Sequence, residues 1–139
     1  MISYHYEADF DLEDDIKYTD WISNVVAGES RKLGDLSYVF CTDEYLFTLN
    51  EKYLGHKSYT DIITFDYSVE NTISGEIYIS IDRVKENARK FKVEFNTELR
   101  RVMAHGVLHL VGYKDKTEKE RELMRTKENE KIILFHVKQ

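Results

Sequence analysis

The sequence lacks proline altogether, and its 139 residues include a single cysteine and only six glycines. Without proline or a Gly/Ser-rich stretch, nothing is typical of a linker, so we expect a single domain over residues 1–139. The lone Cys41 excludes an internal disulfide and favours a reducing cytoplasm. The first residues show neither a basic start nor a long apolar run, so we expect no signal peptide and no membrane span. We therefore predict a cytoplasmic protein.

The charge of the chain is unevenly distributed. The formal net charge of −6 argues on its own against an RNA partner. However, residues 1–30 hold eight acidic side chains against one lysine, whereas residues 83–125 hold twelve Lys and Arg against seven Asp and Glu. A local basic excess can attract phosphates on an acidic protein, although most of these lysines are expected to be ordinary solvated side chains.

Hydrophobic periodicity predicts both strands and helices along the chain. Strands are expected at residues 2–6, 36–41, 60–67 and 74–81. Helices are expected at 11–27, at 43–53, from 80 or 82 to 91, from 96 or 97 to the glycine at 112, and at 117–135. The order β-α-β-α-β-β-α-α-α predicts an α+β fold with one mixed sheet of about four strands, packed with about five helices.

Several side chains predict where these helices begin and which face they bury. Asp11 is the expected N-cap of the first helix, and Thr117-x2-Glu120 forms a capping box before the last. Apolar side chains at helical spacing predict the buried faces, which comprise Leu12, Ile16, Ile22, Val25 and Val26 in the first helix, Tyr45, Leu46, Leu49 and Tyr53 in the second, and Leu99, Val102, Met103, Val107 and Leu110 in the fourth.

The most informative stretch is residues 98–116, which reads E-L-R-R-V-M-A-H-G-V-L-H-L-V-G-Y-K-D-K. His105 and His109 are four residues apart, so on a helix both imidazoles lie on one face. Gly112 can take a left-handed conformation and end the helix, after which Asp115 can return to the point that both histidines face. Two imidazoles and a carboxylate form a three-ligand site with a position left for water. We therefore predict that His105, His109 and Asp115 bind one zinc-like divalent ion.

The spacing of these ligands is the skeleton of the extended zinc motif of metzincin peptidases. Gly106 stands where such a peptidase has its general-base glutamate, and Asp115 stands where it has a third histidine. The sequence thus keeps a metal site without the peptidase base. The carboxylate lowers the charge of the site by one, so a bound water is expected to be less acidic than in an all-histidine site. Manganese or magnesium also become acceptable besides zinc.

The segment H-G-V-L-H-L-V-G-Y-K-D resembles the signature of the YbeY family, bacterial endoribonucleases of ribosomal RNA maturation. That signature runs His-Gly-x-Leu-His-Leu-x-Gly-Tyr-Asp-His, and seven of its nine specified positions match. Lys114 replaces the aspartate, and Asp115 replaces the third histidine. Further blocks resemble the family in the same order: Asn50-x2-Tyr53-x-Gly55, T-D-I-I-T-F at residues 60–65, and Gly75-Glu76-Ile77. The resemblance spans essentially one whole domain.

The resemblance implies an α+β fold and a single-strand-type endoribonuclease with a zinc-like metal site, which acts in ribosomal RNA processing and in ribosome maturation and quality control. It implies ribosomal RNA as the partner, with proteins of the small ribosomal subunit as further candidates, and we expect neither DNA nor a membrane. The family has an arginine after the tyrosine of its first block, where this chain has Leu54. No catalytic arginine is therefore carried over; His56 or Lys57 could stand in, although nothing in the sequence shows it.

Other side chains in these blocks each have two interpretations. Asp61 can act as a general base, although bracing a turn is favoured. Glu76 can face solvent from a strand or support a histidine. Arg101 lies on the histidine face and either binds a substrate phosphate or pairs with Glu98. Tyr113 can stack a base, although packing against the helix is favoured. His5 and His136 have no partner pattern and are expected to be structural.

Three functions remain open at this stage. The first is the metal-dependent endoribonuclease that the resemblance implies. The second is a metallopeptidase-like hydrolase, which the absence of a glutamate at position 106 disfavours. The third is a non-enzymatic ribosome-maturation factor with a structural metal, which Leu54 leaves possible.

Overall fold

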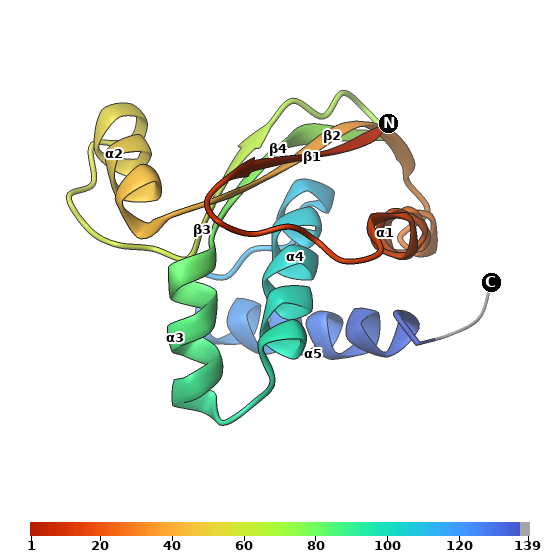
Figure 1. Ribbon diagram of the computed structural model, residues 1–139. Coiled ribbons are helices and arrows are strands. Elements are labelled where there is room, and N and C mark those ends of the chain that lie inside the picture. The colour runs from red at the N-terminus through yellow and green to blue at the C-terminus, as the bar shows by residue number, and fades with distance from the viewer. Residues whose placement is uncertain (137–139) are drawn as a thin grey trace.

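A computed structural model describes residues 1–136, and its elements follow the predicted order (Figure 1). The strands are β1 (Ile2–Glu7), β2 (Lys32–Cys41), β3 (Ile62–Asp66) and β4 (Thr72–Ser80). The helices are α1 (Asp15–Gly28), α2 (Asp43–Leu54), α3 (Ile81–Phe91), α4 (Phe95–Val111) and α5 (Glu118–Leu134). The predicted α+β class, with one mixed sheet and helices packed on it, is confirmed.

The strands form one sheet in the order β1-β2-β4-β3. β1 pairs with β2, and β2 with β4, in parallel, whereas β3 runs antiparallel to β4. A parallel pair needs a long crossover, and α1 supplies it between β1 and β2. The antiparallel pair needs only the short connection at residues 67–71. β3 is therefore an edge strand, and α4 packs against both β3 and β4.

The two faces of the sheet are covered differently (Figure 1). The main core lies between α1, α4 and the face that carries Tyr38, Phe40 and Ile77. On the other face α2 covers β3 and β4, where Leu46 packs with Cys41 and Ile63 in a smaller cluster. α3 and α5 pack mainly on α4. Helix α4 is thus held between the sheet and two other helices, which fixes the side chains that it carries.

Helix ends follow local capping chemistry, with some corrections to the predicted boundaries. The Thr117 capping box is confirmed, and Gly112 ends α4 at φ 123°, a backbone conformation that favours glycine. The predicted cap at Asp11 was wrong: Asp14 caps α1, because its side chain accepts a hydrogen bond from the Lys17 backbone N–H. α4 begins at Phe95 rather than at position 96 or 97.

The remaining corrections concern strand starts and the exposed sides of two helices. β2 begins at Lys32 instead of position 36, because a bulge between Leu33 and Leu36 breaks the alternation that marks a strand. Ile16 lies in the first turn of α1 and is 72% exposed. Tyr45 and Tyr53 are also exposed, since α2 turns Leu46 and Asn50 toward the sheet instead.

Within residues 1–136, no helix combines the length and the apolar character that crossing a bilayer requires.

Candidate metal centre

The two histidines lie on the face of α4 that looks away from the main core. The opposite face of the helix is buried and includes Met103, Val107 and Leu110, which belong to the predicted stripe. His105 and His109 are one turn apart, and their ring centroids are 4.6 Å apart. Because the buried face fixes the rotation of α4, both imidazoles are directed toward a common point.

The chain returns to that point after α4 ends. Asp115 Oδ2 is 3.2 Å from His105 Nε2 and 3.2 Å from His109 Nε2. Two ligand atoms at about 2.1 Å from one tetrahedral ion are about 3.4 Å apart, so this spacing fits a shared ion. Two imidazole nitrogens and a carboxylate oxygen are also a donor set that zinc accepts. His105, His109 and Asp115 therefore form a cluster that could hold a metal ion.

Glu128 of α5 supports the first histidine from behind. Its Oε2 accepts a hydrogen bond from His105 Nδ1 at 2.6 Å, which leaves Nε2 directed at Asp115. Burial would lower the pKa of His105, but the hydrogen bond and charge of Glu128, together with the charges of Asp115 and Asp61, raise it. A carboxylate on the far nitrogen orients the ring and makes it a better ligand.

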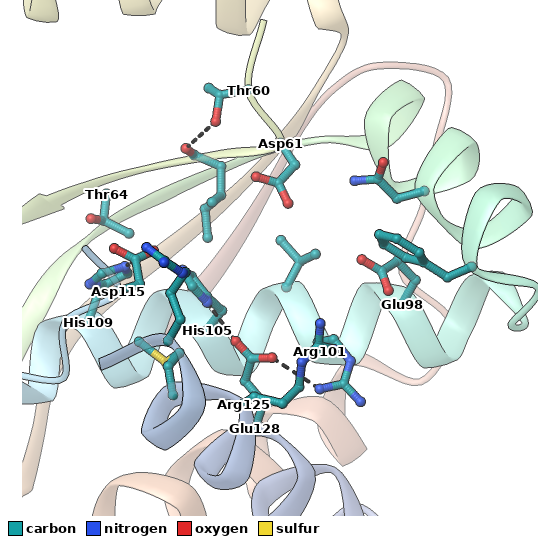
Figure 2. A pocket seen from close by; sticks show the side chains of 16 residues that line it. Thr60, Asp61, Thr64, Glu98, Arg101, His105, His109, Asp115, Arg125 and Glu128 are labelled. Atoms are coloured by element: carbon teal, nitrogen blue, oxygen red, sulfur yellow. Dashed lines mark hydrogen bonds and ion pairs between the residues drawn. The ribbon is translucent and has the colours of Figure 1, made fainter. Parts of the chain in front are cut away.

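These side chains line a cavity of about 510 Å³ (Figure 2). The edge of β3 forms one wall with Thr60, Asp61 and Thr64, and Glu98 projects from the first turn of α4. Burial raises the pKa of the Asp61 and Glu98 carboxyls above their usual values. The cavity thus places two further acidic groups around the metal cluster.

Three arginines give the same cavity a cationic side: Arg101 of α4, and Arg121 and Arg125 of α5. Arg101 does not pair with Glu98, so that alternative was wrong. Instead its Nη1 donates to Glu128 Oε1 at 3.0 Å and its Nη2 donates to Asn129 Oδ1 at 2.9 Å. Arg101 is therefore held by α5 while it lines the cavity.

Gly106, the residue after the first histidine, lies where α4 packs so closely on the sheet that a side chain has no room. A Cβ at this position would lie 2.8 Å from Ile77 Cγ2 and 2.9 Å from Ile62 Cδ1, so α4 and the sheet touch here. A glutamate at position 106 would meet these two isoleucine side chains, so a peptidase base cannot be added there without displacing them or the helix. The geometry thus counts against the peptidase alternative.

The other candidate residues lie in different places. Asp61 lines the cavity, whereas Glu76 lies on the opposite face of the sheet and accepts hydrogen bonds from Tyr67 and Tyr78. Its alternative as a partner of a histidine was therefore wrong. Tyr113 packs against the main core, as the favoured alternative predicted, and its hydroxyl also donates a hydrogen bond to Glu29 Oε1 at 2.6 Å.

The position of the family arginine lies outside the histidine cavity. Leu54 and His56 line a second cavity, and Lys57 is exposed in the loop that follows α2. His5 is exposed on β1 beside Ser3, and His136 contacts the ring of Phe135, so both remain structural.

Sequence reasoning missed Glu128, Arg121 and Arg125, all of which come from α5. A signal was present for the first of them. Met124, Glu128 and Lys131 recur at helical spacing and are all buried, so the stripe contains two charged members. A charged side chain on a buried stripe requires a partner in another element, and His105 is that partner for Glu128.

Comparisons with known proteins agree on one family. The family model described as Endoribonuclease YbeY matches residues 5–136. The protein named Endoribonuclease YbeY of Flavobacterium johnsoniae is 52% identical over 139 residues, covering 100% of both chains. That of Christiangramia forsetii is 53% identical over 138 residues, covering 99% of this chain and 96% of the relative. The solution structure of TM1509 from Thermotoga maritima has a TM-score of 0.69 at 26% identity, covering 97% of this chain and 89% of that one.

Proposed function

The chain belongs to the YbeY family of endoribonucleases, and on that premise we propose that it hydrolyses RNA in the cavity that contains His105, His109 and Asp115. The observation that carries the proposal is the convergence of two imidazole Nε2 atoms on one carboxylate oxygen, with Glu128 bonded to the far nitrogen of His105. We propose one divalent ion per chain, with zinc preferred by the two nitrogen ligands and manganese or magnesium acceptable to the carboxylate.

The ion, when bound, supplies a Lewis acid for a phosphodiester oxygen and lowers the pKa of a water that it holds. The side chains of the protein position the ion and bind the RNA. His105 and His109 are held by the rigid packing of α4, and Glu128 keeps the His105 ring in one orientation. Arg101, Arg121 and Arg125 provide positive charge for the RNA backbone beside the cluster. We propose that these histidines, Glu128 and the three arginines all belong to one domain.

The finer features of the substrate rest on the family resemblance. We propose that the RNA is ribosomal, that cleavage serves ribosome maturation in the cytoplasm, and that proteins of the small ribosomal subunit help to present it. The uneven charge supports such help, because residues 1–30 are strongly acidic and unsuited to RNA.

The decisive experiment measures cleavage of a structured ribosomal RNA fragment by the wild type, His109→Ala and Asp115→Ala, with metal content determined on the same samples. We expect both variants to lose metal and cleavage together, with a loss of activity of about 100-fold or more, since each removes one of three ligands.

A matched control is His5→Ala, because His5 is an exposed histidine outside the cavity and should change neither quantity. A wild type that binds metal and cuts no RNA, beside ligand variants that only unfold more easily, would contradict the proposal. The non-enzymatic maturation factor with a structural metal would then be the better account.

A further inference from the structure

A second cavity, of about 410 Å³, adjoins the histidine cavity at the edge of β3. Thr60, Ile62 and Thr64 line both cavities, so a ligand that follows the edge of β3 can occupy both. The other walls come from α2 and the loop after it, with Asn50, Leu54, His56, Ser58 and Tyr59, and from Ile63 of β3. The metal cluster does not use any of these side chains.

Tyr59 gives this cavity an exposed aromatic surface. Its side chain is 60% exposed, although its ring lies 4.8 Å, centroid to centroid, from the half-buried ring of Phe47 on α2. Phe47 supports one side of Tyr59 and restricts its motion, while the rest of the ring remains accessible. Single-stranded RNA binds to aromatic surfaces of this kind, because every base has a face that can stack.

Asn50 adds a directed hydrogen-bond acceptor. This residue is 4% exposed, and its Nδ2 donates to the carbonyl oxygen of Ser58 at 3.0 Å. Only the amide nitrogen can donate to a carbonyl, so this bond fixes which end of the side chain is the oxygen. Among residues 1–136 no hydrogen bond uses Asn50 Oδ1. Asn50 lines the cavity, so this oxygen, which has no partner among the described residues, can accept a hydrogen bond from a ligand there.

The two cavities differ in charge, and the difference indicates which part of a nucleotide each receives. Three arginines and four carboxylates line the histidine cavity, so a divalent ion at the cluster would make its lining net positive, which suits a phosphate. The second cavity has Leu54 and Tyr59 instead, together with an amide oxygen, and such a lining suits an uncharged planar group that carries an amino group.

We propose that the cavity lined by Tyr59 and Asn50 binds one unpaired nucleobase of the RNA, while the neighbouring phosphate lies in the histidine cavity. Tyr59 stacks on the base, and Asn50 Oδ1 accepts a hydrogen bond from its amino group. This inference rests on the proposed function, and it gives a physical basis for the single-stranded substrate that the family resemblance implies, since a base inside a duplex cannot leave its stack without an energetic cost.

The test uses the full chain with a short single-stranded RNA that contains 2-aminopurine, whose fluorescence falls when the base stacks. Tyr59→Ala is compared with Tyr59→Phe, which keeps the ring, and with Tyr67→Ala. Tyr67 is the matched control, because it is 58% exposed and lines neither cavity. We expect Tyr59→Ala to weaken binding about tenfold and to abolish the fluorescence loss, and the other two variants to stay within about twofold of the wild type. In cleavage, KM should rise while kcat is kept.

The outcomes separate this inference from the proposed function. Equal binding by Tyr59→Ala and Tyr67→Ala overturns the base site, even when the wild type cleaves RNA. Tighter binding of a duplex than of the same single strand also overturns it. A wild type that quenches 2-aminopurine through Tyr59 yet cleaves no RNA supports the base site and counts against the proposed nuclease.

Discussion

Helix α5 carries two groups of buried charged side chains, and Glu128 of the first group lines the histidine cavity whereas Lys131 of the second does not. In the first group, Glu128 bonds to His105 and Arg101. In the second group, less than one turn further along, Lys131 is 2% exposed and its Nζ is 2.8 Å from Glu29 Oε2. Glu29 also accepts hydrogen bonds from Tyr113 and Lys127, so its carboxylate is surrounded by donors from the protein.

The difference shows that buried charge alone does not mark a functional site. Burial would raise the pKa of Glu29, but hydrogen bonds from Lys131, Tyr113 and Lys127 outweigh it and lower the pKa to about 2. Around the histidines, by contrast, burial raises the pKa of Asp61 and of Glu98. The Glu29 group is complete within the protein and serves packing, whereas the Glu128 group directs polar atoms into a space where a ligand can meet them.

Lys131→Met should produce the largest effect and should act on stability alone. It leaves Glu29 buried without its closest cation, which is expected to lower the free energy of unfolding by about 3 kcal/mol. Cleavage and metal content of the folded protein should stay unchanged. Urea unfolding, with cleavage measured well below the transition, checks both expectations. If the folded Lys131→Met variant loses its metal, the Glu29 group also supports the metal cluster, and the two groups do not differ in their role.

Glu128→Ala should show the reverse pattern, with its main effect on the metal. Removal of the carboxylate behind His105 is expected to reduce metal affinity and cleavage about 10–100-fold. Glu128→Gln should retain part of both, because its amide oxygen can still accept from Nδ1. Competition with a chelator measures the affinity. Glu130→Ala is the control, since Glu130 lies two positions further along α5 with a largely exposed side chain. If Glu128→Ala binds the metal with wild-type affinity, the hydrogen bond between His105 Nδ1 and Glu128 is not needed for metal binding.

Mild acid should lower the free energy of unfolding through protonation of Glu29, and this effect should be the smallest of the three. The pKa of Glu29 is about 2 when folded against an ordinary value of 4.5, so its stabilising contribution is present above pH 4.5 and is lost as the pH falls toward 2. Between pH 6 and pH 4 this contribution should fall by about 1 kcal/mol. The slope of unfolding free energy against pH in this range should be shallower in Glu29→Gln, and equal slopes would refute the assignment.

The His105, His109 and Asp115 cluster, which could hold a metal ion, could be predicted from sequence because its geometry is local. His105, His109, Gly112 and Asp115 lie within one helix and the turn after it, so spacing alone brings them together. Glu128 could not be placed in the same way, because its contact with His105 depends on how α5 packs against α4. The same packing explains why one of the two alternatives for Arg101 was wrong, because Arg101 pairs with Glu128 from another helix and not with Glu98 one turn away.

The element order was predictable for a similar reason, since each helix and strand has its own periodicity. The position of β3 at the edge of the sheet was not, because strand order depends on crossovers rather than on local pattern. Asp61 shows the consequence: a turn brace was the favoured interpretation, yet the edge position of β3 brings this residue into the cavity wall.

The bond between Trp21 and the backbone of Lys131 joins residues 110 positions apart, and it has a consequence for the order of synthesis. Every strand, α1 and the histidines leave the ribosome before Glu128 and Lys131 do. While α5 is still inside the exit tunnel, the Trp21 side chain has no acceptor there and His105 has no carboxylate behind it. A nascent chain can therefore build its sheet early, but it cannot complete the contacts around His105 and Trp21 until α5 has emerged.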